Sequence, residues 1–245
     1  MSTPSSTPSP KSGGRRTALL AGGTALLVAG AAVGGVLWFQ GGDGDGAAPY
    51  TIALPDHLLD GAYTRDADRP GPGDGAEDLD GDTQAKELGI TDGKGFMGQY
   101  VNSKKQNLNV YGVSGRIADP RKVLDALVSK SEEGAARSPA DAPGRKFRTV
   151  TPWTEFHPPG FDGVIMKCTS SKSTRAPGTV SVRLDTSQCY WADTSAVGGV
   201  QHMVMTFDGL PPNGRENPGA TGEVMSAEAL SEATAKVRNE AREKK

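Results

Sequence analysis

The sequence has few of the residue types and motifs that most often carry chemistry. Its 245 residues include two cysteines, three histidines and only 6% aromatic residues. It lacks P-loop spacing, the Rossmann glycine pattern, the G-x-S-x-G turn of many hydrolases and the H-E-x-x-H pattern of zinc enzymes. We therefore predict no catalytic residue, no metal site and no cofactor.

The charges are unevenly distributed along the chain. The net charge is −2, from 29 acidic and 27 basic residues, and the first 16 residues carry Lys11, Arg15 and Arg16 but no acid. Every acidic residue lies at or after Asp43. An acidic balance without a basic stripe argues against nucleic acid as a partner.

One long run lacks charge altogether. It reads TALLAGGTALLVAGAAVGGVLWF and spans Thr17 to Phe39. As a helix, its 23 residues would extend about 34 Å, enough to cross a hydrocarbon core of about 30 Å. The sequence therefore predicts a transmembrane helix over 17–39, with the lipid bilayer as its partner.

The flanks of this run predict its orientation. Arg15 and Arg16 precede it, and no Lys or Arg follows until Arg65, which predicts a cytoplasmic N-terminus and an extracytoplasmic C-terminal region. Trp38 and Phe39 then lie at the outer interface. The run is longer than a usual secretory h-region, so we favour an uncleaved anchor over a cleaved signal peptide.

Inside the predicted anchor, Gly30 and Gly34 match the G-x-x-x-G pattern of helix dimers. They are the candidate helix-dimer contact, and the sequence leaves the oligomeric state open. The pattern supports an alternative function, in which the protein is a membrane sensor or scaffold that signals through self-association of this helix.

Composition divides the chain into four parts. Residues 1–16 are predicted to be a disordered cytoplasmic tail, because they are rich in Ser, Thr and Pro. The transmembrane helix 17–39 is followed by a Gly- and Asp-rich linker, 40–49. Residues 50–245 mix apolar and polar residues and are predicted to form the extracytoplasmic domain.

Local patterns in this domain predict an α+β fold with a mainly antiparallel sheet and two main helices. The first main helix follows Asp119 as N-cap and Pro120, and the second follows Ser226 and runs to the C-terminus. A short helix is predicted at 83–88. Strands are predicted at 95–102, 108–115, 163–168, 179–184, 189–192 and 198–207.

Cys168 and Cys189 lie on the predicted outer side of the membrane, where paired cysteines usually oxidise. Their spacing fits no zinc pattern, and two cysteines alone do not fill a structural zinc site. We predict a structural disulfide; a redox pair or two free thiols are the alternatives. Trp191 is interpreted as core packing beside this disulfide.

The segment CYWADTSAVGG, residues 189–199, contains the polar residues closest to a catalytic pattern. Asp193, Ser195 and either His157 or His202 would make a hydrolytic triad, but nothing in the sequence indicates that geometry. We instead predict that 193–196 is a turn between two strands.

Gly198 and Gly199 follow this turn. They suit a bulge or a close approach of other groups to the backbone.

Two further segments suggest ligands. Asp78, Asp80 and Asp82, within the acidic loop 74–82, match the start of a calcium loop, but the sixth position is Thr83 rather than glycine. We interpret this loop as solvated, with calcium binding as the alternative.

Lys172 and Arg175 lie in 170–178, which is predicted to connect two strands. Their hypothetical ligand is an anionic envelope polymer.

Several stretches together resemble an actinobacterial, streptomycete-type family of uncharacterised proteins that have one membrane helix and a secreted domain. The stretches are LLDGAY, AKELGI, VYGVSGRIADPRKVLDAL, VIMKC, CYWADTSAVGGV and AKVRNEAR. The family shows a Cys-x-Trp-x-Asp-x-Ser-Thr pattern. Here the pair of hydroxyl residues lies one position earlier, at Thr194 and Ser195. The resemblance supports the membrane topology and the disulfide, and it implies no activity.

These observations predict a membrane-anchored, non-catalytic module that binds or assists an envelope protein or polymer. A wall-directed hydrolase and the membrane sensor or scaffold are the alternatives.

Overall fold

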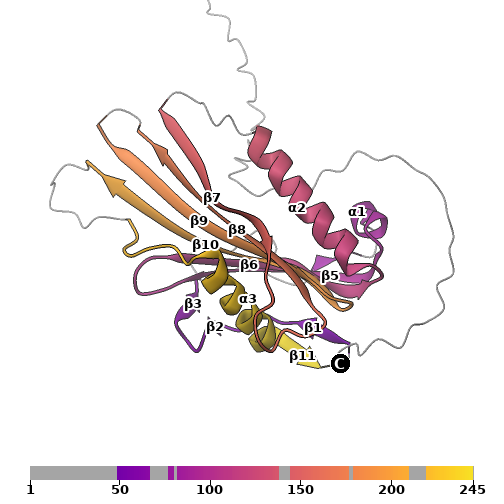
Figure 1. The fold of residues 1–245 in the computed structure, drawn as a ribbon. Coiled ribbons are helices and arrows are strands. Elements are labelled where there is room, and N and C mark those ends of the chain that lie inside the picture. The colour runs from indigo at the N-terminus through magenta and orange to yellow at the C-terminus, as the bar shows by residue number, and fades with distance from the viewer. Residues whose placement is uncertain are drawn as a thin grey trace, which may run out of the picture.

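The computed structural model describes residues 49–66, 77–79, 82–137, 144–176, 179–209 and 219–244. These ranges form eleven strands and three helices (Figure 1). In chain order they are β1 (Tyr50–Ile52), β2 (His57–Leu58), β3 (Tyr63–Arg65), β4 (Glu77–Asp78), α1 (Thr83–Glu87), β5 (Ile90–Val101), β6 (Asn107–Ile117), α2 (Pro120–Arg137), β7 (Arg145–Glu155), β8 (Ile165–Arg175), β9 (Ser181–Ala192), β10 (Ala196–Asp208), α3 (Ala227–Ala241) and β11 (Arg242–Lys244).

The main sheet has nine strands, and every pairing in it is antiparallel. The strand order is β2-β3-β5-β6-β10-β9-β8-β7, and β4 also pairs with β5. After β6, α2 takes the chain to the far edge, where β7 begins. Three reversals of direction then return the chain through β8 and β9 to β10 beside β6. The predicted α+β class with a mainly antiparallel sheet is therefore confirmed.

Each face of the sheet packs against one long helix (Figure 1). We call these the α3 face and the α2 face. Strand residues alternate between them, because successive side chains of a strand point to opposite sides. The cores include Leu230, Val237, Val110, Met166 and Val200 on the α3 face, and Val123, Leu124, Ile90, Ile117 and Ala192 on the α2 face.

The predicted helix starts are confirmed. Asp119 accepts a hydrogen bond from the backbone N–H of Lys122 (3.0 Å), and Pro120 is the first residue of α2. Ser226 accepts one from the backbone N–H of Ala229 (3.0 Å) at the start of α3. Satisfying these otherwise unpaired N–H groups fixes where each helix begins.

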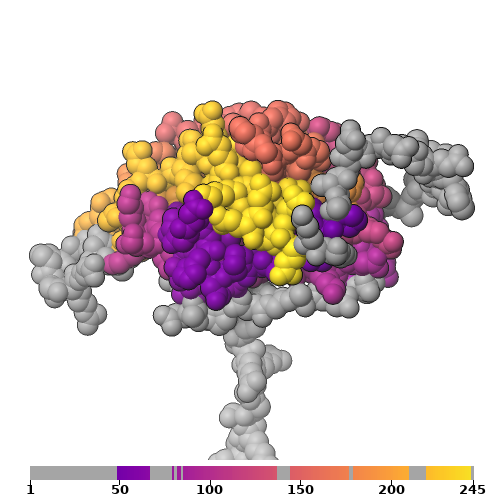
Figure 2. All heavy atoms as spheres, turned by 90° about the horizontal axis from the view of Figure 1, so that it is seen from below, coloured from indigo at the N-terminus to yellow at the C-terminus, as the bar shows by residue number. Residues whose placement is uncertain are grey.

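The prediction that the last helix runs to the C-terminus is wrong. The helix ends at Ala241, and β11 then pairs with β1 in a separate two-stranded sheet. The Arg242 guanidinium lies over the Tyr50 ring (4.6 Å to the centroid), so this cation stabilises the pairing rather than the end of the helix. The first and last described segments therefore lie side by side, indigo and yellow in Figure 2.

Strand β7 was not predicted, and the predicted connection over 170–178 is wrong in its first half. Residues 170–175 continue β8 and pair with both β7 and β9. Sequence patterns miss β7 because it is a mostly exposed edge strand that contains Pro152 and two register shifts. These features remove the strict alternation that marks a half-buried strand.

The predicted transmembrane helix, with Arg15, Arg16, Gly30, Gly34, Trp38 and Phe39, lies outside the described residues. Within the described ranges, none of the helices has the length and apolar character needed to span a membrane.

Candidate functional site

The predicted disulfide is present in the core of the α3 face. Cys168 and Cys189 are directly opposed on β8 and β9, and both are fully buried. Trp191 is buried in the same core, as predicted, and its ring stacks against Phe96. Cys189 and Trp191 of the segment 189–199 are therefore core residues.

Removing the disulfide is expected to destabilise the fold. The Cys168→Ala/Cys189→Ala variant should lower the free energy of unfolding by about 3 kcal/mol, because the unfolded chain regains the entropy that the cross-link removed. Urea unfolding of both proteins, followed by tryptophan fluorescence, measures the difference. An unchanged midpoint would contradict this prediction. The double variant has no cysteine, so its midpoint should be the same with and without reductant, which controls for effects of the reductant.

The glycines of this segment permit a close approach of aromatic rings. Gly198 is directly opposite Trp191, and a Cβ atom at Gly198 would lie 2.3 Å from the Trp191 ring. On the other face, a Cβ atom at Gly199 would lie 2.8 Å from the Tyr111 ring. The pairing of β10 with its neighbours is continuous here, so the two glycines make room for rings and form no bulge.

Asp193 organises the turn between β9 and β10. One carboxylate oxygen, Oδ1, accepts hydrogen bonds from the backbone N–H groups of Ser195 (2.7 Å) and Ala196 (3.0 Å). The other, Oδ2, accepts from Nη2 of Arg238 (2.6 Å) and from the Tyr50 hydroxyl (2.5 Å). The predicted turn is confirmed, and its carboxylate also joins the first and last described segments.

The ion pair of Asp193 and Arg238 is almost completely buried. The Arg238 guanidinium lies between the rings of Tyr50 (4.9 Å) and Phe161 (5.0 Å). Burial and the neighbouring Asp193 carboxylate raise the pKa of Tyr50, so its hydroxyl stays protonated and donates a hydrogen bond to Asp193. These contacts give Asp193 a role in holding the fold together.

The residues of the sketched triad do not come together. His202 lies six residues beyond Ala196 in β10, which is about 20 Å along a strand. His157 is exposed and lies near Glu155 (3.6 Å between Nε2 and Oε1). His202 is therefore too far from Ser195 to act as its base, and the charged contact of His157 is with Glu155.

His202 is a buried residue of strand β10. Its Nδ1 accepts a hydrogen bond from the backbone N–H of Met225 (3.0 Å), and its Nε2 lies 2.9 Å from the Tyr63 hydroxyl. Burial lowers the pKa of His202 to about 4 and raises that of Tyr63 to about 12. Both side chains are therefore neutral near pH 7.

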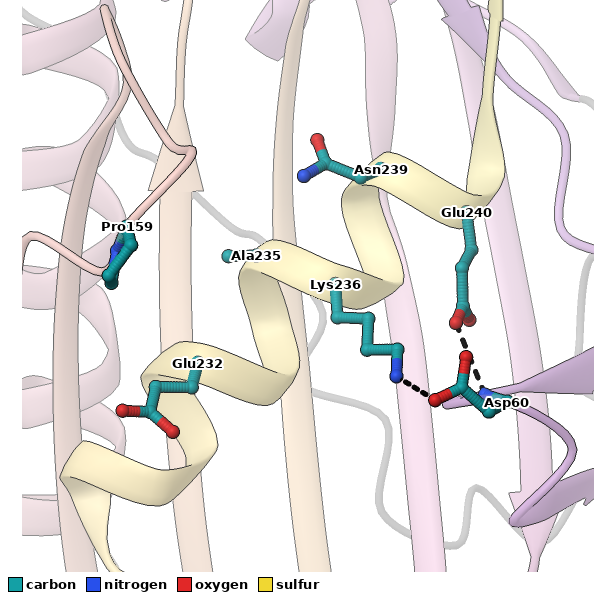
Figure 3. Close-up of a pocket in the computed structure, with 7 residues that line it drawn as sticks. All are labelled: Asp60, Pro159, Glu232, Ala235, Lys236, Asn239 and Glu240. Atoms are coloured by element: carbon teal, nitrogen blue, oxygen red, sulfur yellow. Dashed lines mark hydrogen bonds and ion pairs between the residues drawn. The ribbon is translucent and has the colours of Figure 1, made fainter.

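A shallow depression lies along the outer side of α3 (Figure 3). Asp60 lines it and forms an ion pair with Lys236. Glu240 accepts hydrogen bonds from the backbone N–H groups of Leu59 (2.7 Å) and Asp60 (3.2 Å), two successive residues with φ of 57° and 58°. Two such N–H groups form a concave anion site, which the chain's own carboxylate fills. The contacts that line the depression therefore hold the loop after β2 against α3.

The end of the main sheet that lies away from the turn at 193–196 carries an excess of positive charge. We call it the distal end and define it as residues 145–151, 170–175, 181–187 and 202–208 of β7 to β10. It contains two carboxylates, Asp185 and Asp208, and six cations, which are Arg145, Lys146, Arg148, Lys172, Arg175 and Arg183. This excess contrasts with the net charge of −2 for the whole chain.

Four of these cations share the α3 face. Directly opposed residues of antiparallel strands point to the same side of a sheet. One cross-strand row consists of Lys146, Thr174 and Arg183, and the next consists of Arg148, Lys172 and Asp185. Lys172 lies four positions from the buried Cys168 in β8, so the period of two places both rows on the α3 face.

Asp185 is the buried member of these rows. Its side chain is 9% exposed, and its Oδ2 lies 3.6 Å from Nζ of Lys172 and 3.9 Å from Nε of Arg183. The two cations are themselves about half exposed, at 47% and 51%. One carboxylate therefore holds two cations at the surface and neutralises only part of their charge.

Exposed apolar side chains lie at this end as well. Among the described residues, the large apolar side chains that are exposed are Phe147 and Val150 of β7 and Met205 of β10. Phe147 and Met205 share a row on the α2 face with Ser173 and Leu184. The distal end thus combines cations with apolar groups, a composition suited to binding.

The sequence suggested only part of this surface. Lys172 and Arg175 were both proposed to contact an anionic polymer, but they lie on opposite faces because they are three positions apart in β8. The contributions of Lys146, Arg148 and Arg183 were missed, because they depend on β7 and on the strand register. A signal did exist in the cluster RKFR, residues 145–148.

The candidate calcium loop falls mostly outside the described residues, which include only Asp82 with its side chain. Asp82 accepts a hydrogen bond from the backbone N–H of Ala85 (2.8 Å) and so caps α1. The described residues contain no group of three or more His, Cys, Asp or Glu side chains that would hold a metal ion.

Comparisons of the chain with protein-family models, with curated proteins and with solved structures gave no match. The resemblance to the streptomycete-type family therefore stays a prediction.

Proposed function

We propose that the protein is a single-pass membrane protein whose extracytoplasmic domain binds another component of the cell envelope without catalysing a reaction. The observation that carries this proposal is the distal end of the sheet, where six cations and the exposed Phe147, Val150 and Met205 gather. An exposed surface that combines charge of one sign with apolar side chains is typical of interaction sites.

The position of this surface supports the proposal. Tyr50, the first strand residue after the proposed anchor and linker, contacts Asp193 at one end of β9. Asp185 lies eight residues earlier in the same strand, about 27 Å away. A chain anchored before Tyr50 would therefore present the distal end away from its point of attachment (Figure 1).

The disulfide supports the proposed compartment. Disulfides persist outside the cytoplasm and are rare inside it. A bridge between two fully buried cysteines fits an extracytoplasmic domain. The proposed cytoplasmic N-terminus rests on Arg15 and Arg16.

Site-specific photo-crosslinking in cells tests the proposal. A photoreactive phenylalanine analogue replaces Phe147 at the distal end or, as the control, the exposed Lys122 at the start of α2. We expect a light-dependent product with an envelope component from position 147 and not from 122. Equal products, or none from position 147, would contradict a binding surface at the distal end.

Protease treatment of spheroplasts tests the topology in the same cells. We expect external protease to digest the region beyond residue 49 and to leave the N-terminal tail protected. Protection of both parts would contradict an extracytoplasmic domain.

A further inference from the structure

We propose that the α3 side of the distal end binds a phosphate-bearing polyanion, a wall polymer with repeated phosphodiester groups, through Lys146, Arg148, Lys172 and Arg183. This inference rests on the proposed function and specifies its ligand. The four side chains come from three adjacent strands and form two rows. Rows on one face lie about 7 Å apart, because alternate strand residues are two steps of about 3.4 Å apart.

The arrangement of like charges is costly for the folded state and therefore calls for an explanation. Arg148 lies directly opposite Lys172, and like charges in that position repel each other. Asp185 of β9 lies near Lys172 of the adjacent strand β8 and near Arg183 of its own strand, but it is nearly buried. An anion bound on the exposed side would satisfy the four cations together.

Edge protection explains only part of this pattern. Edge strands often carry lysine or arginine, which discourages pairing with other chains, and β7 is an edge strand with Lys146 and Arg148. Lys172 and Arg183, however, lie on the inner strands β8 and β9. Cations there do not protect an edge, so a ligand accounts for them better.

This part of the α3 face lies beyond the helix that covers the rest. Met225, just before α3, accepts a hydrogen bond from the Ser187 hydroxyl through its carbonyl oxygen and donates its N–H to His202. Arg183 and Asp185 lie further along β9, past this contact. The cations therefore face outward next to the end of the helical layer.

The geometry favours a polymer over the lipid headgroups of the anchoring membrane. The two rows lie about 27 Å and about 34 Å along β9 from the turn that Tyr50 contacts, and Tyr50 follows the proposed anchor. A polymer that extends from the wall reaches this end directly.

The experiment uses the full chain in phosphatidylcholine nanodiscs and fluorescently labelled poly(glycerol phosphate) as the probe, titrated at several salt concentrations. Neutral dextran and vesicles containing phosphatidylglycerol are the comparison ligands. We expect saturable binding to poly(glycerol phosphate) that weakens steeply with salt, and no binding to dextran. Binding to the anionic vesicles alone would overturn the proposal in favour of a lipid headgroup.

Paired variants identify the site. Lys172→Gln/Arg183→Gln and Lys146→Gln/Arg148→Gln should each weaken binding about tenfold and lower the salt slope by about 2. The second pair leaves the contacts of Asp185 intact, so its loss of binding does not depend on a change in stability. Lys94→Gln/Lys122→Gln removes the same charge from exposed positions elsewhere and should change affinity less than about twofold.

Equal losses in all three pairs would overturn the site, because net charge alone would then explain binding. The charge-retaining Lys172→Arg/Arg183→Lys variant should bind nearly as well as the original protein. If the full chain fails to bind poly(glycerol phosphate) while position 147 still gives its crosslinked product, the ligand assignment falls and the proposed function stands. If the binding titration and the crosslink at position 147 both fail, the ligand assignment and the proposed function are both wrong.

Discussion

The Asp193→Ala variant is expected to lose about 3–5 kcal/mol of unfolding free energy, because it leaves the Arg238 cation buried without its anion. The Arg238 side chain is 3% exposed and that of Asp193 is 8% exposed. The substitution also removes the acceptor for the N–H groups of Ser195 and Ala196 and for the Tyr50 hydroxyl. Urea unfolding measures the loss.

A double-mutant cycle separates the ion pair from the other contacts. Arg238→Met removes the buried cation and replaces it with an apolar chain, so Asp193→Ala/Arg238→Met should cost clearly less than the two single changes added together. Arg116→Gln is the matched control, since this arginine pairs with Asp92 (2.7 Å) at the surface and is 77% exposed. It should cost at most about 1 kcal/mol. Strictly additive losses would show that Asp193 and Arg238 do not stabilise each other.

The second large effect is a loss of stability in acid that depends on His202. The unfolded chain protonates this histidine near its ordinary pKa of 6.5, whereas the folded protein does so only near a pKa of about 4. The unfolded state thus binds more protons between these values, and stability falls as the pH falls. The contribution of His202 to the free energy of unfolding is fully present above pH 6.5. This contribution, about 3 kcal/mol, is lost once the pH is below 4.

The contacts of His202 explain why its protonation is costly. Nδ1 accepts the Met225 N–H, so the hydrogen-bond pattern places the ring proton of the neutral form on Nε2, next to the Tyr63 hydroxyl. A second proton on Nδ1 would point at the Met225 N–H group. The directly opposed residue on β9 is Ser187, which supplies no negative charge.

The His202→Gln variant tests this directly. It keeps a hydrogen-bonding side chain and removes the titration, so stability between pH 6.5 and 4 should become less dependent on pH. His157→Gln is the control, because His157 is exposed and should leave the profile unchanged. Urea midpoints measured across this pH range give both profiles, and an identical slope in the His202→Gln variant would refute the assignment.

Local sequence signals predicted elements whose cause is local. Asp119 with Pro120 and Ser226 marked two helix starts, because capping involves only the first turn of a helix. The turn at 193–196 was predictable from its Asp and Ser residues. Cys168 and Cys189 were predictable as a pair because there are only two cysteines, and because the topology predicted from the sequence places both in an oxidising compartment.

Long-range pairing decided what local patterns missed. The end of the last helix at Ala241 depends on β11 pairing with β1, which is nearly two hundred residues away in sequence. Strand β7 is held by β8 and by α2, through contacts such as Arg121 with Glu155 (3.2 Å), and its own residues lack a buried stripe. Neither result follows from the periodicity of a single segment.

The amino-acid sequence by itself determined the α+β class, the helix starts, the disulfide partners and the turn that contains Asp193. The tertiary structure alone decided that Asp193 meets Arg238 and Tyr50, and that Lys146, Arg148, Lys172 and Arg183 share one face. The physical reason is strand register: a shift of one residue moves a side chain to the other face of a sheet, and register depends on pairing with strands that are distant in sequence.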